Sequence, residues 1–82
     1  MSETNELELV VLEKSIGEHG LLIGDVGTVV HRYGDEKASE VEFVDVHGNT
    51  IAVLTLEDSA VRSPAAGEIL HVRDVSPATS GI

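Results

Sequence analysis

Two glutamates near the middle of the chain come closest to a catalytic arrangement. Glu40 and Glu42 stand two positions apart in SEVEFVD, which alternates polar and apolar residues, so both side chains share one face of a strand. They could act as a general acid and base if a concave pocket desolvated one of them. A barrel of this size is filled by its own side chains, so we expect a solvated acidic face instead.

The histidines and serines do not have the spacing of a metal site or a nucleophile. The four histidines are scattered along the chain: His19, His31, His47 and His71. A zinc site needs three or four convergent ligands. No serine lies in a Gly-x-Ser-x-Gly elbow. We therefore expect no catalytic residue, no metal and no cofactor, and we predict that the protein is not an enzyme.

Gly24 and Gly27, three residues apart in GDVGTVV, raise the question of a phosphate loop. A Walker-type loop would end in Gly-Lys-Ser/Thr and open a helix, whereas here a β-branched strand sequence follows. A dinucleotide site would need a βαβ unit, for which the chain offers no helix. We predict a structural turn instead. Gly24 supplies a positive φ angle, and Gly27 allows a close approach at the corner of a barrel.

The composition limits the partners that the protein can have. The 82 residues include fifteen Asp and Glu against five Lys and Arg, giving a formal net charge of −10. Duplex nucleic acid repels such a surface, so nucleic-acid binding is not expected. The sequence has no cysteine, no apolar run long enough to span a membrane and no secretory signal, which predicts a cytoplasmic protein.

The apolar pattern is that of an all-β protein. Alternating or continuous apolar segments predict strands at 7–13, 26–33, 39–45, 50–56 and 69–75. A glycine-rich loop at 13–24, pinned to the core by Ile16, Leu21, Leu22 and Ile23, follows the first strand. A tight hairpin is expected at 47–49 and a helical or 3₁₀ turn at 57–60. We predict one barrel of five to six short antiparallel strands over 7–75, with a disordered N-terminus at 1–6 and a flexible tail at 76–82.

Two stretches resemble a family of short bacterial and archaeal proteins catalogued only as a domain of unknown function. HGLLIGDVGTVVHRY is similar to the family pattern GL..GDVGTVV..Y, and SEVEFVDVHGNTIAVLTL to YEVEFVD..G.T.A..TL. The resemblance covers residues 9–62 and implies an SH3-like five-stranded barrel without assigned catalytic residues. Ala38-Ser39 departs from the pattern, which has a tyrosine just before Val41. The Gly24–Val29 segment is also similar to the first turn of ribosomal KOW modules.

The remaining signal is a surface suited to a protein partner. The predicted partner-binding residues form an acidic groove beside one aromatic ring: Glu18, Asp25, Tyr33, Asp35, Glu36, Glu40 and Glu42. Such a groove favours a basic protein, as in an antitoxin-like or immunity-like pair or an accessory subunit. The alternatives are a KOW-like nucleic-acid or ribosome-associated barrel and a subunit that caps an enzyme's active site. A homodimer is compatible with each of these.

Overall fold

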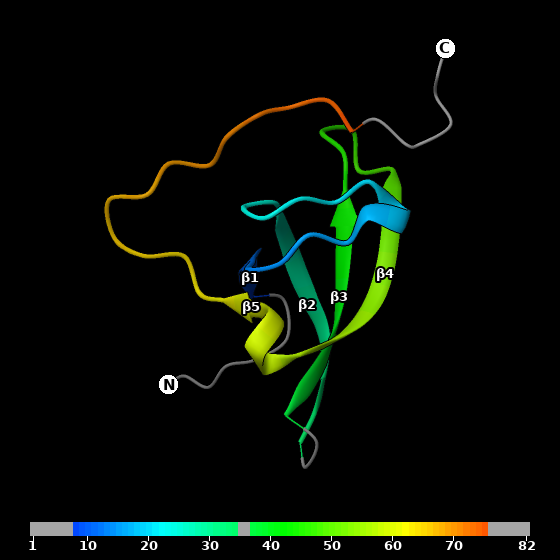
Figure 1. The fold of residues 1–82 in the computed structure, drawn as a ribbon, viewed down its shortest axis with the longest axis vertical. Coiled ribbons are helices and arrows are strands. Elements are labelled where there is room, and N and C mark those ends of the chain that lie inside the picture. The colour runs from blue at the N-terminus through cyan, green and yellow to red at the C-terminus, as the bar shows by residue number, and fades with distance from the viewer. Residues whose placement is uncertain (1–7, 35–36, 76–82) are drawn as a thin grey trace.

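Five short strands form one antiparallel sheet in the computed structural model, which describes residues 8–34 and 37–75 (Figure 1). The strands are β1 (Leu9–Leu12), β2 (Val26–Tyr33), β3 (Ala38–Val44), β4 (Thr50–Glu57) and β5 (Val61–Arg62). Two 3₁₀ helices lie between them, η1 (Gly17–His19) and η2 (Asp58–Ala60). No α-helix occurs in these ranges, and no helix within them has the length and apolar character needed to cross a membrane.

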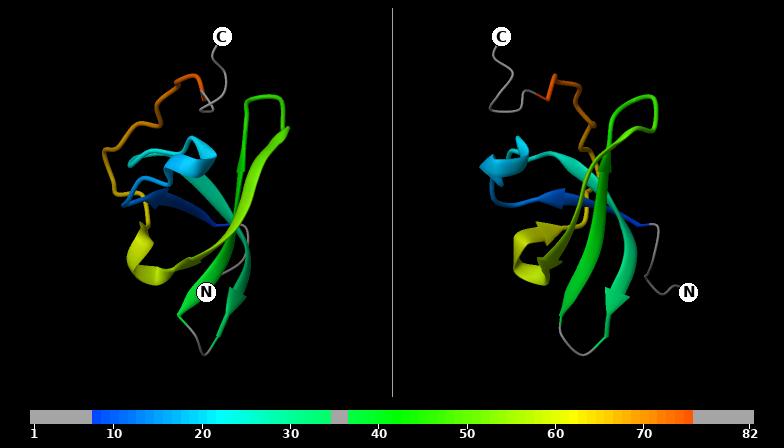
Figure 2. Two further views of the ribbon diagram at one scale, coloured as in Figure 1. Left: turned by 45° about the vertical axis from the view of Figure 1, so that its right-hand side comes forward. Right: turned by 90° about the vertical axis from the view of Figure 1, so that its right-hand side faces the viewer.

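The strand order is β4-β3-β2-β1-β5, so the last strand returns to pair with the first. Strands β2, β3 and β4 form two long, twisted hairpins. Strands β1 and β5 lie across from them on the other side of the core (Figures 1 and 2). The predicted fold class, a small all-β SH3-like barrel of antiparallel strands, is confirmed with five strands.

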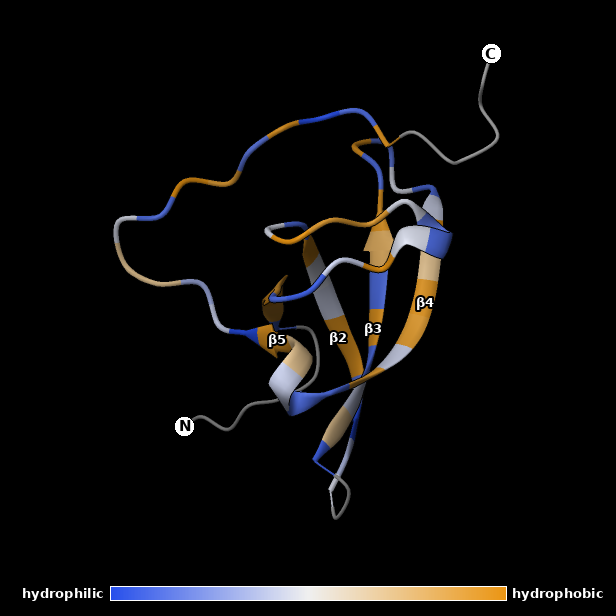
Figure 3. Ribbon diagram, viewed as in Figure 1, coloured by the Kyte–Doolittle hydropathy of each residue, from blue (hydrophilic) through white to orange (hydrophobic). Residues whose placement is uncertain are grey.

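The core consists of aliphatic side chains and one aromatic ring. Its buried members come from all the long strands and from the loop after β1: Val10, Leu12, Leu21, Val29, Val41, Phe43 and Ala52. From Ser39 onward the alternation in β3 is regular, with Val41 and Phe43 buried and Glu40 and Glu42 half-buried on the opposite face. Figure 3 shows the same alternation as changes of colour along the strands. Strand β3 is therefore positioned by its apolar face and presents its glutamates outward.

Each of the two glycines of GDVG occupies a position that favours glycine. Gly24 has a φ of 98°, in the left-handed region that favours glycine. At Gly27 an added Cβ would lie 2.6 Å from Cγ1 of Val41 and 2.8 Å from Cε2 of Phe43. The close approach is thus between the backbone of β2 and side chains of β3, within the strand itself. The absence of a side chain at position 27 leaves the space that Val41 and Phe43 occupy in the core.

The prediction of a strand at 69–75 is wrong. The sheet ends at β5, whose two residues pair with Val11 and Leu12, and residues 63–75 contain no strand. After β5, Arg62 donates two hydrogen bonds to the Glu68 carboxylate. The same carboxylate accepts a hydrogen bond from the backbone N–H of Ala65. These contacts hold a turn that directs the chain away from the sheet, so its later apolar residues have no strand to pair with.

The loop between β1 and β2 is pinned at fewer points than predicted. Leu21 is buried, and Ile16 packs against the core and bridges to Leu21 through backbone hydrogen bonds. Leu22 and Ile23 are exposed.

The hairpin at 47–49 is confirmed. The Asp45 carboxylate accepts hydrogen bonds from the backbone N–H groups of residues 47 and 49. Segments 1–6 and 76–82, predicted to be loose, lie outside the described residues.

Candidate functional site

The outer face of β3 carries two adjacent carboxylates whose orientation is fixed by hydroxyl groups. Glu40 Oε1 accepts hydrogen bonds from the Tyr33 hydroxyl at 3.0 Å and from the Thr55 hydroxyl at 2.8 Å. Glu42 Oε2 accepts one from the Thr50 hydroxyl at 2.7 Å. These donors come from β2 and β4, the two neighbours of β3, so the sheet itself orients the acidic groups. We call Glu40, Glu42 and their three donors the acidic face.

An aromatic pair extends the acidic face onto β2. A register shift between Val29 and His31 places His31 opposite Glu40. The rings of His31 and Tyr33 then meet edge to face, with centroids 4.7 Å apart. Of the predicted partner-binding residues, the structure thus brings together Glu40, Glu42 and Tyr33.

Two other predicted residues lie on the opposite side of the sheet. Glu18 is exposed in η1, and Asp25 precedes β2. Both belong to the loop whose Leu21 packs into the core. The Asp25 carboxylate already holds the Arg73 guanidinium. The described residues therefore do not form one continuous acidic groove. Asp35 and Glu36, the remaining predicted members, lie outside the described residues.

The arginines are neutralised by carboxylates of the same chain. Each of the three forms an ion pair: Arg32 with Asp58 at 3.7 Å, Arg62 with Glu13 at 3.7 Å and Glu68 at 2.8 Å, and Arg73 with Asp25. By contrast, no Lys, Arg or His within 8–34 and 37–75 forms an ion pair with Glu40 or Glu42. Glu40 and Glu42 are therefore two neighbouring carboxylates on one face that have no cationic partner among the described residues.

Metal binding receives no geometric support from the described residues. Among them, no group of three or more His, Asp or Glu side chains is arranged to hold an ion. Glu40 and Glu42 accept their hydrogen bonds from neutral hydroxyls, and their surroundings are open to solvent. The arrangement is suited to attracting cationic groups at a surface.

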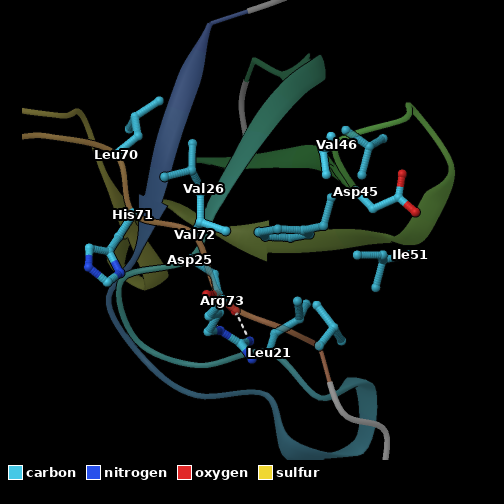
Figure 4. Close-up of a pocket in the computed structure, with 13 residues that line it drawn as sticks. Leu21, Asp25, Val26, Asp45, Val46, Ile51, Leu70, His71, Val72 and Arg73 are labelled. Atoms are coloured by element: carbon cyan, nitrogen blue, oxygen red, sulfur yellow. Dashed lines mark hydrogen bonds and ion pairs between the residues drawn. The ribbon is translucent and has the colours of Figure 1, made fainter.

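A second feature, not predicted from the sequence, is a pocket beneath residues 63–75, which we call the strap. The strap leaves β5 and returns across the end of the sheet where β3 and β4 are joined (Figure 1). A pocket of about 370 Å³ lies under it, lined on the sheet side by Phe43, Val46 and Ile51 and on the strap side by Leu70 and Val72 (Figure 4). Residue spacing gives no signal for this pocket, because its walls come from separate parts of the chain.

The strap is held at its far end by Arg73. Its Nε donates to Asp25 Oδ1 at 2.8 Å, and its Nη2 donates to Asp25 Oδ2 and to the Gly20 carbonyl at 2.9 Å. Burial of Asp25 by itself raises the pKa of the carboxyl. Hydrogen bonds from Arg73 and the Leu22 amide, together with the charge of Arg73, hold that pKa below its ordinary value of 3.8. Asp25 is therefore ionised at neutral pH.

The contact between Arg62 and Glu68, at the start of the strap, should persist at low pH. The hydrogen bonds from Arg62 and then from the Ala65 amide lower the pKa of Glu68 from 4.5 to about 2. Because this pKa is depressed in the folded chain, the contact contributes fully above pH 4.5 and is lost as the pH falls through about 2. A carboxyl NMR titration should give Glu68 a midpoint near 2, and Arg62→Gln should move it back toward 4.5. A midpoint near 4.5 in the unaltered protein would contradict the contact.

The comparison with protein families agrees with the sequence resemblance. A family model described as "Domain of unknown function (DUF4926)" matches residues 6–63, which include all five strands and the acidic face and stop at the start of the strap. No curated protein and no solved structure matches the chain. Since the match covers more than half of the sequence, the chain belongs to the DUF4926 family, a domain of unknown function.

Proposed function

We propose that this protein is a non-enzymatic interaction module that acts in the cytoplasm and binds a basic protein partner through its acidic face. The observation that carries the proposal is the pair Glu40 and Glu42. Both are oriented by hydroxyl donors, and neither is paired with a cation of the described chain. A net charge of −10 adds a long-range attraction for a basic surface.

The geometry of the acidic face favours binding over chemistry. Three hydrogen bonds hold the two carboxylates in place, so a Lys or Arg side chain that approaches them meets oriented acceptors. The aromatic pair beside Glu40 offers ring surface for the aliphatic part of such a side chain. Charge at such a site raises the association rate and the selectivity for basic partners, and both effects weaken with salt.

The test begins with capture of partners from a lysate of the source organism, using the tagged full chain at low and moderate salt. The captured protein is then purified, and its affinity is measured by calorimetry. We expect Glu40→Lys with Glu42→Lys to lower the affinity about tenfold or more, because two attractive contacts become repulsive. Glu40→Gln with Glu42→Gln removes only the attraction and should give a smaller loss.

A matched control separates the acidic face from total charge. Glu8→Lys with Asp74→Lys changes the net charge by the same amount at exposed positions outside the acidic face. This control should lower the affinity by less than threefold, and circular dichroism should show all three double variants folded. Equal losses of affinity in the Glu40→Lys/Glu42→Lys variant and the Glu8→Lys/Asp74→Lys control would overturn the assignment to the acidic face. Capture of RNA in place of a basic protein would support the KOW-like alternative and overturn the proposal.

A further inference from the structure

The strap lies outside the residues that define the family. The family match ends at residue 63, and the strap continues from there without regular structure. It touches the rest of the molecule at two polar anchors, Arg62 with Glu68 at its start and Arg73 with Asp25 near its end. Between these anchors it arches away from the sheet, as the views in Figure 2 also show.

The far anchor is a built receptor for an arginine. The Asp25 carboxylate is only 18% exposed and accepts the Arg73 guanidinium through both oxygens. The Leu22 amide holds the carboxylate in position at 2.8 Å, and the Gly20 carbonyl accepts a further hydrogen bond from the same guanidinium. Arginine fits this arrangement because its planar fork matches a carboxylate at two points, which a lysine ammonium cannot do.

The apolar part of the strap is poorly fitted to the pocket beneath it. Val72 on the strap and Val46 on the facing hairpin are each 88% exposed, and Leu70 is exposed as well. The pocket of about 370 Å³ between them is therefore not filled by the chain itself. Exposed apolar side chains around an unfilled pocket are typical of a binding surface. The strap thus satisfies the charged end of the site and leaves the apolar end open (Figure 4).

We propose that Asp25, the Gly20 carbonyl and the pocket under the strap form a docking site for an extended, arginine-bearing segment of a partner protein. In the isolated chain, Arg73 occupies the arginine position as an intramolecular competitor. The partner's arginine replaces Arg73 on Asp25, and its neighbouring apolar residues fill the space beside Phe43 and Ile51. Charge argues against a second copy as the occupant, because two chains of −10 each repel one another.

This site is separate from the acidic face, and the two can fail independently. Asp25 belongs to the loop that packs on the inner side of the sheet, whereas Glu40 and Glu42 point outward from β3. None of the residues that line the pocket belongs to the acidic face. The test below therefore leaves Glu40 and Glu42 unchanged.

The probe is a synthetic peptide with the sequence of residues 66–75, AGEILHVRDV, blocked at both ends and added to the full chain. Binding is followed by NMR shifts of the Gly20 and Leu22 amides, which also detect weak complexes. We expect weak binding to the unaltered protein, because a tethered Arg73 competes at an effective concentration in the millimolar range. Arg73→Gln removes the competitor and should raise the affinity about tenfold or more.

Two controls test the arginine requirement. A peptide with glutamine at the arginine position should not bind the Arg73→Gln protein, and a peptide with lysine there should bind more weakly than the arginine peptide. Asp25→Asn keeps an oxygen for the Leu22 amide, and added to Arg73→Gln it should abolish binding of the arginine peptide. The glutamine peptide requires no change at Asp25, so it tests the arginine requirement even where Asp25→Asn disturbs the loop.

Several results would overturn the proposal. Equal affinity for the unaltered and Arg73→Gln proteins would show that Arg73 does not occupy the binding site. Equal binding of the arginine and glutamine peptides, or no binding of any peptide to the Arg73→Gln protein, would show that Asp25 is not an arginine receptor. A dimer of the unaltered protein that dissociates on Arg73→Gln, measured by light scattering, would make a second copy the occupant.

Discussion

Gly27→Val is expected to destabilise the fold strongly. Even the first atom of the new side chain would lie 2.6 Å from Val41 and 2.8 Å from Phe43, closer than carbon atoms can approach. Overpacking of a core costs about 1–3 kcal/mol and sometimes more. A chain of this length has a total stability of roughly 4–12 kcal/mol. We therefore expect a loss of about 3 kcal/mol or more.

Urea unfolding followed by far-ultraviolet circular dichroism measures this loss. Gly17→Ala is the matched control, because an added Cβ there meets nothing within 4 Å and the φ angle is not in the left-handed region. It should leave the midpoint almost unchanged. Gly27→Ala combined with Phe43→Leu should be less destabilised than the sum of the two changes, since the smaller side chain makes room. A Gly27→Val protein with an unchanged midpoint would refute the packing argument.

Leu21→Ala should produce the second large effect. Leu21 is 2% exposed and is the buried side chain that fixes the loop between β1 and β2 to the core. Truncating a fully buried leucine costs about 2–5 kcal/mol, because apolar contacts are lost and a cavity remains. The same loop carries Asp25 and Gly20, so the change should also loosen the anchor for Arg73.

Ile23→Ala is the control for Leu21→Ala within the same loop. Ile23 is 66% exposed, so its truncation should change the free energy of unfolding by less than about 0.5 kcal/mol. Both variants can be compared by urea unfolding, and the Gly20 and Leu22 amide signals report the loop directly. Equal stability of the two variants would mean that burial of Leu21 does not hold the loop.

The central strands were predictable because local and tertiary signals agree there. The segment 26–33 is rich in β-branched residues and is followed by a glycine, and β2 has those bounds. In β3 the spacing of Glu40 and Glu42 placed both on one outward face, which is the observed acidic face. Period-two patterns specify faces directly, so this part of the candidate site followed from sequence.

The course of the strap was not predictable, because it depends on tertiary contacts that the local sequence does not encode. Residues 69–75 have strand-like composition, but a strand forms only where a partner edge is available. Val61 and Arg62 already pair with the free edge of β1. The turn held by Glu68 then directs the following residues away from the sheet. The contact between Asp25 and Arg73 joins residues 48 positions apart, and no local pattern encodes such a pair.

The pairing of β1 with β5 also has an entropic consequence. Closing it joins residues roughly fifty positions apart, against about six for the β3–β4 hairpin, so its loop closure costs about 2 kcal/mol more. Only two residue pairs, Val11 with Arg62 and Leu12 with Val61, offset that cost within the sheet. The backbone hydrogen bond from Glu13 to Ala60 and the ion pair of Glu13 with Arg62 add to them. The pairing of β5 with β1 at the edge of the sheet is therefore the strand pairing with the least support, and it lies where the strap begins.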